Sequence, residues 1–279
     1  QNEIGDAQSD LRLQYLLDRL REDKLVVAFV AEFSRGKSEL INAVFFAGYG
    51  NRIMPASAGR TTMCPTELQW KSGDQPEIRL LPIESRKTNA SITELKRYPE
   101  EWQVRPLDTR SAESLQAALA QVGETRLVTQ QEAEELGFPI NENGDGGIRP
   151  DADGKLEIPR WRHAIIQFPH PLLEQGLVIL DTPGLNAIGA EPELTLNLLP
   201  NAHAVLFILA ADTGVTQSDL AVWREHVNAG RRQRGRIVAL NKIDGLWDGL
   251  RSEAEIEREI AGQVASVATT LDIEPSQVY

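Results

Sequence analysis

The order of apolar and polar residues divides the chain into short strands that alternate with amphipathic helices. Apolar runs typical of buried strands occur at 25–30, 66–70, 77–82, 161–168, 177–180, 204–210 and 236–240. After the first run, Leu40, Ile41 and Val44 recur at helical spacing on one face. Further helices are predicted at 111–122, 219–228 and 252–268. This alternation predicts an α/β domain with a mostly parallel central sheet and helices on both faces.

A polar and heterogeneous stretch, 84–160, interrupts the alternation and is predicted to be a long insert. Ser91 with Glu94, and Thr129 with Glu132, have the capping-box spacing that marks the start of a helix. The insert is therefore expected to contain short helices of its own.

The segment before the first strand, 6–23, has the pattern of an amphipathic helix with a stripe of leucines. Two interpretations remain open: it packs on its own domain, or it is one segment of a helical stalk that further sequence completes. We therefore divide the chain into an N-terminal helix, 1–23, and an α/β domain, 24–279. Because the last residues resemble the start of a strand, we expect the domain to continue beyond Tyr279.

Composition narrows the possible partners and environments. The chain has 279 residues, of which 41% are hydrophobic and 25% charged, and its net charge of −12 argues against broad binding to nucleic acid. Cys64 is the only cysteine, so the sequence contains neither an internal disulfide nor a cysteine-based zinc site. Its apolar runs are far shorter than a membrane-spanning helix, and no signal peptide is visible. We expect a cytoplasmic protein.

The stretch 25–44 has the organisation of strand, tight loop and helix that is typical of a phosphate-binding loop. Gly36, Lys37 and Ser38 fit the pattern G-x-x-x-x-G-K-[ST], whereas Ala31 stands where the first glycine is expected. Lys37 is expected to reach the terminal phosphates, and the Ser38 hydroxyl is expected to bind Mg²⁺. The residues predicted to surround the phosphates are Glu32, Phe33, Ser34, Arg35, Gly36, Lys37 and Ser38.

Two further segments offer groups for Mg²⁺ and the terminal phosphate. Thr62, at the end of a glycine-containing loop, can place its hydroxyl on Mg²⁺ and its N–H on the phosphate. Asp181 directly follows a predicted strand and can hold Mg²⁺ through water. Gly184 can approach the phosphate with its bare N–H. We therefore predict a metal site of Ser38, Thr62 and Asp181.

The segment Asn241-Lys242-Ile243-Asp244 follows another predicted strand and supplies a base-reading group. The Asp244 carboxylate can accept hydrogen bonds from both N1–H and the exocyclic amine of guanine, a pair that adenine does not offer. The stem of Lys242 is expected to lie against the base. The order of these motifs along the chain predicts a guanine-nucleotide site.

With these motifs in place, the segments VAEFSRGKSELINAVF, IMPASAGRTTMCPTEL, VILDTPGL, VLFILAADTGVTQSDL and VALNKIDGLW resemble bacterial members of the dynamin-like large GTPases. The resemblance covers about residues 24–275 and places the family's motif threonine on Thr62. It implies Mg²⁺-dependent GTP hydrolysis, stimulated when GTPase domains form a homodimer across their nucleotide faces. It also implies membrane remodelling through a stalk, with peripheral attachment to lipids on the inner membrane face. The fifth GTPase motif is expected beyond Tyr279.

Two residues carry open alternatives. In eukaryotic dynamins a glutamine that orients the attacking water stands at the position of Phe33, and Arg35 supplies a cation nearby. Guanylate-binding proteins, a related family, carry a loop arginine that stabilises transition-state charge, one position earlier. Arg35 either plays this part or faces solvent, paired with an acid such as Glu32 or Glu39. Asp219 lies where the family contacts its dimer partner, and it either faces that partner or caps a helix.

Three hypotheses about function follow. The domain is an assembly-stimulated enzyme that works on membranes, a nucleotide-dependent switch or scaffold without membrane work, or a nucleotide-binding protein with little hydrolysis. Turnover measured against protein concentration separates them.

Overall fold

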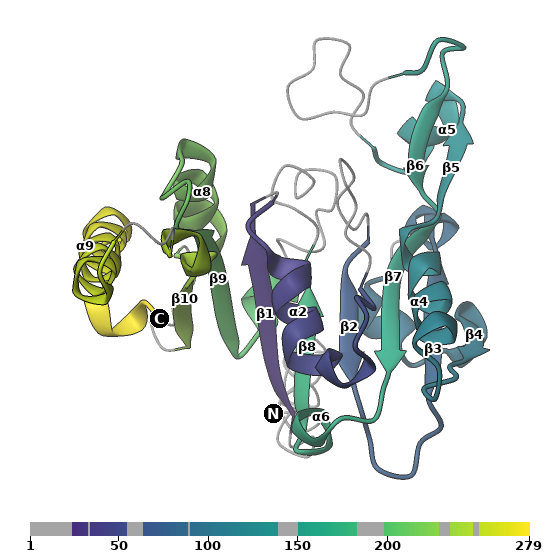
Figure 1. Cartoon of the computed structure of the whole chain (residues 1–279). Helices are drawn as coiled ribbons and strands as arrows, with labels where there is room; N and C mark the ends of the chain where they lie inside the picture. Colours follow the sequence, from purple (N-terminus) through teal and green to yellow (C-terminus); the bar gives the residue numbers. More distant parts are fainter. Residues whose placement is uncertain are drawn as a thin grey trace, which may run out of the picture.

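An eight-stranded sheet forms the centre of the structure, in the order β10-β9-β1-β8-β2-β7-β3-β4 (Figure 1). The structure is a computed structural model and describes residues 24–32, 34–54, 64–88, 90–138, 150–182, 198–228, 235–247 and 251–279. The strands are β1 (Leu25–Ala31), β2 (Thr66–Gln69), β3 (Glu77–Pro82), β4 (Gln103–Pro106), β7 (Trp161–Gln167), β8 (Leu177–Asp181), β9 (Ala204–Ala210) and β10 (Arg236–Asn241). A second sheet pairs β5 (Thr125–Val128) with β6 (Leu156–Pro159).

The central sheet mixes parallel and antiparallel pairs. β10, β9, β1 and β8 run parallel to one another, as do β2 and β7. β2 runs antiparallel to β8, and β3 runs antiparallel to both β7 and β4. The arrows of β1 and β7 accordingly point in opposite directions in Figure 1. The predicted α/β sheet is confirmed, but its mostly parallel character is limited to the half that contains β1.

Helices connect and cover the strands. They are α2 (Lys37–Phe45), α3 (Ile92–Leu95), α4 (Ala112–Ala120), α5 (Gln130–Glu135), α6 (Pro171–Glu174), α7 (Leu199–Asn201), α8 (Gln217–Val222) and α9 (Glu253–Leu271). Short 3₁₀ turns are η1 (Ala47–Tyr49), η2 (Ile83–Lys87), η3 (Pro99–Glu101), η4 (Gln121–Gly123), η8 (Ile243–Leu246) and η9 (Pro275–Gln277). The π-helical turn η7 (Trp223–Val227) continues α8.

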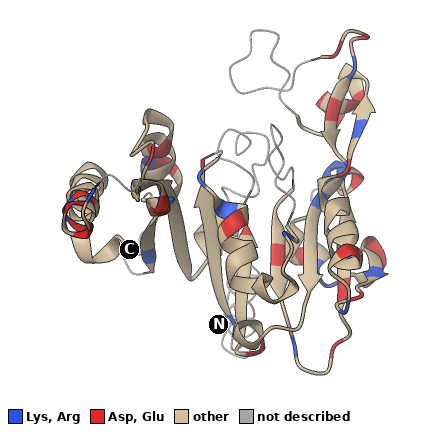
Figure 2. Ribbon diagram, viewed as in Figure 1, with Lys and Arg blue, Asp and Glu red and all other residues tan. Residues whose placement is uncertain are grey.

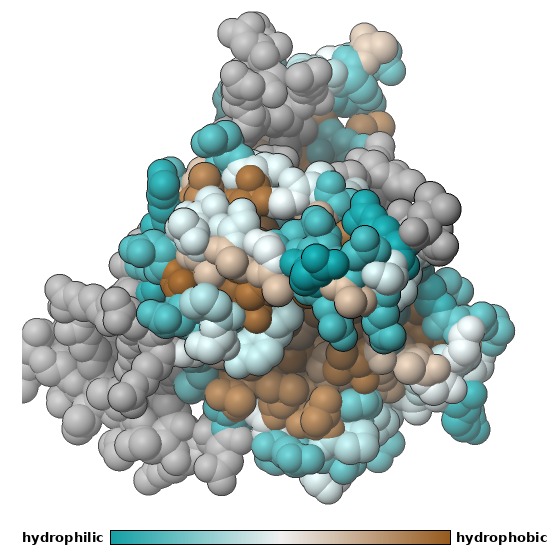
Figure 3. Space-filling view, turned by 60° about the vertical axis from the view of Figure 1, so that its left-hand side comes forward, coloured by the Kyte–Doolittle hydropathy of each residue, from teal (hydrophilic) through white to brown (hydrophobic). Residues whose placement is uncertain are grey.

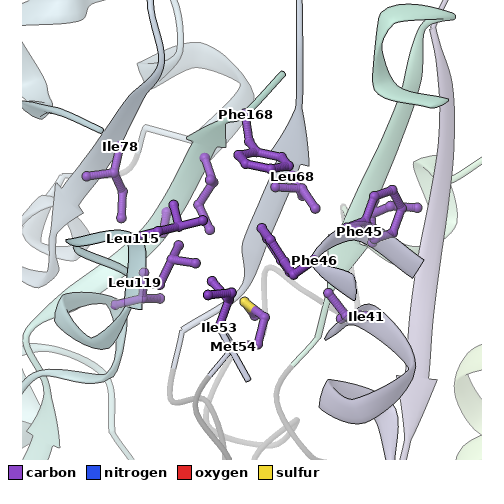
Figure 4. Packing of buried hydrophobic residues seen from close by; sticks show 14 of the residues in the cluster. Ile41, Phe45, Phe46, Ile53, Met54, Leu68, Ile78, Leu115, Leu119 and Phe168 are labelled. Carbon is purple, nitrogen blue, oxygen red and sulfur yellow. The ribbon is translucent and has the colours of Figure 1, made fainter. Parts of the chain in front are cut away.

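Alternate residues of β1 build two cores, one on each face of the sheet. Phe29 and Ala31 belong to a core shared with α2 and α4, and Figure 4 shows side chains of these helices meeting over β2. Ala28 and Val30 belong to the opposite core, which includes residues of α9 and the π-helical turn after α8. Because successive strand residues point to opposite faces, one uncharged strand anchors both layers. β1 is thereby held firmly up to the loop that follows it.

The face that α2 buries differs from the predicted one. Ile41 is buried as expected, but Val44 is 40% exposed, and Asn42 and Phe45 are buried instead. The Asn42 amide explains this, because its Oδ1 accepts from the backbone N–H groups of Ile53 and Met54 at 3.0 and 2.7 Å. A polar residue on the inner face is stabilised here by backbone hydrogen bonds that the apolar pattern does not reveal.

The ends of several other predicted elements shift. The helix predicted at 219–228 begins at Gln217, with Thr216 as its cap, and loses regular α geometry after Val222. The helix predicted at 252–268 extends to Leu271. The predicted capping box of Ser91 and Glu94 is confirmed. The predicted N-terminal helix, 6–23, lies outside the described residues.

The antiparallel pair of β5 and β6 and helix α5 form a small unit at the end of the molecule away from α9 (Figure 1). It has its own apolar cluster, which includes Val128, Leu136 and Ile158. Thr129 caps α5 by accepting from the Glu132 N–H at 3.2 Å, as the capping-box spacing predicted.

A charge cluster between β2, β7 and the end of α3 joins buried Glu67 and His163 to the more exposed Lys96. Lys96 Nζ donates to both oxygens of the Glu67 carboxylate at 2.6 and 2.7 Å, and His163 Nε2 lies 3.2 Å from Oε1. Burial by itself would raise the pKa of Glu67, but Lys96 and His163 together outweigh burial and hold the pKa far below its usual range.

Some exposed apolar residues lie at the sheet edge where β1 begins. On the face that carries α8, α9 and β10, hydrophilic residues dominate the upper part and hydrophobic residues gather lower down (Figure 3). Leu25 at the start of β1 is 52% exposed and Ile237 near the start of β10 is 40% exposed. The opposite edge, where β1 ends, carries the candidate site.

Candidate nucleotide-binding site

The parallel strands β1, β8, β9 and β10 end at one edge of the sheet, and the predicted motifs follow these ends. Phe29 of β1 is level with Asp181 of β8. Ala31 is level with Ile208 of β9, and Asn241 of β10 with Ala210. Figure 2 shows that β1 is uncharged and that charged residues begin where it passes toward α2. The topology therefore brings segments far apart in the sequence to one place.

The phosphate-binding loop owes its shape to Ser34 and Gly36. Ser34 has φ 60° and Gly36 has φ 85°, both in the left-handed region, and α2 begins directly afterwards at Lys37. A Cβ on Gly36 would lie 2.3 Å from Nδ2 of Asn241, so glycine is required for close approach as well as for φ. The N–H groups of the first turn of α2 consequently point toward the space above the sheet edge.

The unexpected Ala31 is explained by its position. It is the last residue of β1, fully buried and paired with β9, so it has ordinary strand geometry. The missing glycine therefore imposes no backbone penalty at this point of the loop.

Lys37 and Asp181 meet across the edge, as the motifs predicted that they would share one site. Lys37 Nζ donates to Oδ1 of Asp181 and to the carbonyl of Thr182, and both charged side chains are largely buried. Thr182 is fixed in turn, because its hydroxyl donates to the carbonyl of Phe29 at 2.8 Å. The other carboxylate oxygen of Asp181 is buried and makes no hydrogen bond within the described residues. It is the kind of unsatisfied oxygen that a metal-bound water can use.

The donor set fits Mg²⁺ held in part by substrate rather than a cage made by protein. The described residues contain no group of three or more histidine, cysteine or acidic side chains placed for a metal. A single carboxylate, Asp181, and the hydroxyl of Ser38 in the first turn of α2 fit an ion that retains water and phosphate ligands.

The base-reading segment is joined to the phosphate loop. Asn241 Nδ2 donates to the Arg35 carbonyl at 2.9 Å. Lys242 has φ 59°, and its Nζ donates to Asp212 at 3.1 Å. Hydrogen bonds from Lys242 and Thr213 lower the pKa of Asp212. Asp244 lies in η8 and is exposed, so its carboxylate is accessible to a base.

Arg35 is held by residues of the segment between β9 and α8. Its guanidinium is buried, and it donates to Thr213 Oγ1, to Thr216 Oγ1 at 3.3 Å and to Asp219 Oδ2 at 2.8 Å. The alternative of a solvent-facing side chain paired with Glu32 or Glu39 is wrong. A role at transition-state charge stays a prediction that would require Arg35 to leave Asp219.

Asp219 is fully buried and faces Arg35. It also caps α8, because its Oδ2 accepts from the Thr216 N–H at 2.9 Å. The predicted capping role is therefore present, whereas a contact with a dimer partner stays a prediction that the buried position does not favour.

Three predicted site residues, Phe33, Thr62 and Gly184, lie outside the described residues. Glu32, directly after β1, is half-buried. Sequence reasoning missed Thr182, Thr213 and Thr216 as contacts of the loop. Thr216 and Asp219 have the T-x-x-D spacing of a capping box, so the start of α8 was readable, although its contact with Arg35 was not.

A Gly-Lys helix start facing an aspartate of the adjacent parallel strand defines the P-loop nucleotide-binding class. The sequence model of the dynamin family matches residues 27–243, well over half of the chain, and the chain belongs to this family.

Curated relatives agree with this family. A bacterial dynamin-like protein of Nostoc punctiforme is 29% identical over 101 residues, which are 36% of this chain and 14% of the relative. Dynamin-like protein A of Bacillus subtilis is 22% identical over 222 residues, which are 74% of this chain and 18% of the relative. The matched part thus spans less than a fifth of either relative.

A solved structure supports the fold. A chain of an oligomerised bacterial dynamin pair, described as a mechanism for long-range sensing and tethering of membranes, superposes with a TM-score of 0.51. The sequence identity is 17%, and the match covers 98% of this chain and 35% of that chain. No helix in the described part of this chain combines the length and the apolarity needed to cross a bilayer.

Proposed function

We propose that this domain binds guanine nucleotides with Mg²⁺ and hydrolyses GTP to GDP and phosphate. The observation that carries the proposal is the contact between Lys37 at the start of α2 and Asp181 at the end of β8. It places a cation and an acid at one helix N-terminus, where phosphates bind.

In the proposed reaction, water attacks the terminal phosphate in line with the bond to the leaving GDP oxygen. Lys37 leaves Asp181, binds the terminal phosphates and offsets their negative charge, while the N–H groups in the first turn of α2 hold the phosphates. Ser38, Thr62 and, through water, Asp181 would hold Mg²⁺, which when bound neutralises phosphate charge. Thr62 and Gly184 orient water and phosphate through backbone groups.

Recognition of guanine falls to the segment after β10. Asp244 accepts from the two N–H groups of the base edge, and Lys242 supports the base plane. Asn241 serves the site indirectly, because its amide holds the Arg35 carbonyl.

For the full-length protein we propose homodimerisation through these domains and peripheral attachment to a membrane surface. Support comes from membership in the dynamin family and from a structural neighbour described as tethering membranes. A GTP-dependent switch with slow turnover is the second candidate. The Arg35–Asp219 pair favours it, because Asp219 holds the guanidinium that would otherwise be free to stabilise transition-state charge.

Phosphate release with GTP and Mg²⁺, measured at increasing protein concentration, tests both candidates. We expect turnover with GTP and none with ATP, and a specific rate that rises with concentration. Lys37→Ala should abolish turnover, whereas Lys71→Ala, in an exposed turn at the opposite sheet edge, should retain it. A low rate that is independent of concentration supports the switch, and failure to bind GTP overturns the proposal.

A further inference from the structure

The Arg35 side chain is held by a site of its own, built from the segment between β9 and α8. Arg35 is 6% exposed and Asp219 is 0% exposed. Thr213, Thr216 and Asp219 all accept from the guanidinium, and they lie 178 to 184 positions from Arg35 in the sequence. We call these residues the Arg35 anchor.

Capping α8 does not require this burial. The structure contains another capping box, Ser252 with Glu255 at the start of α9, and it lies exposed to solvent. Burying the Asp219 carboxylate costs desolvation, which the Arg35 charge offsets together with hydrogen bonds from the Thr216 N–H and hydroxyl at 2.9 and 2.7 Å. Asp219 therefore serves two elements at once, because it caps α8 and also supplies the only acidic partner of Arg35 among the described residues.

The anchored residue sits between two left-handed positions. Ser34 has φ 60° and Gly36 φ 85°. A left-handed conformation is unfavourable for serine, and such strain persists only where surrounding contacts determine it. Arg35 is fixed from both ends, because the anchor holds its guanidinium and Asn241 holds its carbonyl at 2.9 Å. The anchor thus helps to maintain the loop shape that presents the helix N-terminus.

The ion pair has unused bonding capacity. Within the described residues, Arg35 Nε and Asp219 Oδ1 are both buried without a hydrogen bond, so the pair is joined through one nitrogen and one oxygen only. A pair of this geometry is weaker than a bidentate one. The anchor can therefore yield when the segment between β9 and α8 moves.

We propose that Asp219 is a positioning residue of the phosphate-binding loop, and that the anchor sets nucleotide affinity through Arg35. This inference rests on the proposed binding of guanine nucleotides. The segment also reaches the base-reading loop, because Asp212 binds Lys242 at 3.1 Å and Thr213 at 2.9 Å. Asp212, Gln217 and Ser218 are exposed, so contact at this surface acts on both loops together.

Binding of fluorescent GDP with Mg²⁺ to Asp219→Asn tests the inference. The substitution keeps the volume and a cap acceptor but removes the charge that Arg35 faces. We expect affinity about tenfold lower, the size typical of a coupled network. The selectivity for GDP over IDP should stay unchanged, because Asp244 is not altered, whereas general loosening of the site would reduce it.

A double-mutant cycle tests whether Asp219 acts on nucleotide binding through Arg35. Arg35→Gln should weaken GDP binding to a similar degree, and adding Asp219→Asn to it should cost little more, because both act through one contact. Arg35→Lys should recover part of the affinity. Glu255→Gln, in the exposed capping box of α9, is the matched control and should bind GDP normally.

Unaltered GDP binding by folded Asp219→Asn, or full additivity in the cycle, overturns the inference and leaves the proposed function intact. If Asp219→Asn does not fold, Thr213→Val replaces it, because this exposed position loses only one acceptor of Arg35. Affinity equal to that of the unaltered protein in Thr213→Val would then overturn the inference. Failure of the unaltered protein to bind GDP overturns both proposals.

Discussion

Gly36→Ala is the sharpest perturbation of the loop geometry. Gly36 has φ +85°, and an added Cβ would lie 2.3 Å from Nδ2 of Asn241, closer than real Cβ contacts allow. The alanine methyl must therefore displace the Asn241 amide or move the loop. Either movement breaks the hydrogen bond from Asn241 to the Arg35 carbonyl.

The magnitude follows from these two terms. An alanine forced into the left-handed region costs about 1–2 kcal/mol. The lost hydrogen bond costs about 1 kcal/mol. The sum is about 2–3 kcal/mol, and if all of it appears in binding, GDP affinity falls roughly 30-fold to 150-fold. If it appears in folding instead, the melting temperature falls by about 2–4 °C for each kcal/mol in a chain of this size.

Two glycine controls separate the terms, with GDP titration and thermal unfolding as the assays. Gly50 has φ +66° and no neighbouring atom within 4 Å of the place that an added methyl group would take, so Gly50→Ala should show the backbone strain alone. Gly262 lies within α9 without a positive φ or a close neighbour, so Gly262→Ala should stabilise the domain by about 0.5–1 kcal/mol. Neither control should alter GDP affinity.

The reasoning is refuted if Gly36→Ala matches the unaltered protein in both melting temperature and GDP affinity. It is also refuted if Gly36→Ala behaves like Gly50→Ala, because the approach of Asn241 would then have no energetic consequence.

Three other expectations are independent of that loop. Asp244→Asn should change the base preference of the site from guanine to xanthine, because the new amide can donate a hydrogen bond to the second carbonyl of xanthine. Competition binding with XTP and GTP measures this preference. Lys96→Met should raise the pKa of Glu67, because burial raises this pKa and the variant removes a positive charge that lowers it. A depressed pKa of Glu67 stabilises the fold above the unfolded value of about 4.5, and this stability is lost as the pH falls. Acid unfolding of Lys96→Met, followed by circular dichroism, should therefore begin at a higher pH than that of the unaltered protein. Gly235→Ala should lower the melting temperature, because its Cβ would lie 2.5 Å from the His203 carbonyl.

Each of these has an outcome that contradicts it. Retained preference for GTP in Asp244→Asn removes Asp244 from base recognition. An acid transition at the same pH in Lys96→Met shows that Lys96 does not control Glu67, with Lys87→Met, an exposed ion-pair lysine, as the control. Equal stability of Gly235→Ala shows that β10 can shift away from His203.

The sequence predicted the buried elements well because their information is local. β3 (Glu77–Pro82) and β9 (Ala204–Ala210) match the predicted runs residue for residue, since an apolar run bounded by polar residues marks a buried strand. The four-residue strands β4, β5 and β6 were missed. Strands this short carry too few residues to show a period, and Val104 and Leu127 in them are exposed.

Strand directions and contacts between distant residues could not be predicted from the sequence, for a different reason. β2, β3 and β7 have the pattern of ordinary apolar runs, which does not show that β2–β8, β3–β7 and β3–β4 pair antiparallel and so make the sheet mixed. In the site, the motifs predicted that Lys37 and Asp181 serve one nucleotide site, and the structure brings the two side chains into contact. The motifs did not reveal the contact of Arg35 with Asp219, because no local pattern encodes a pair that the topology brings together.

The departure at Ala31 gains a physical meaning from this contrast. A motif comparison gives each glycine position the same weight. Ala31, however, is a strand residue whose backbone pairs with β9, so this position does not need the unusual φ that favours glycine. The left-handed φ values of the loop are those of Ser34 and Gly36. Gly36 adopts this conformation readily because it lacks a side chain, whereas Ser34 relies on neighbours that hold the chain in place. Because Arg35 has contacts at both its guanidinium and its carbonyl, we expect the loop to depend more on the segment between β9 and α8 than on its own first residue.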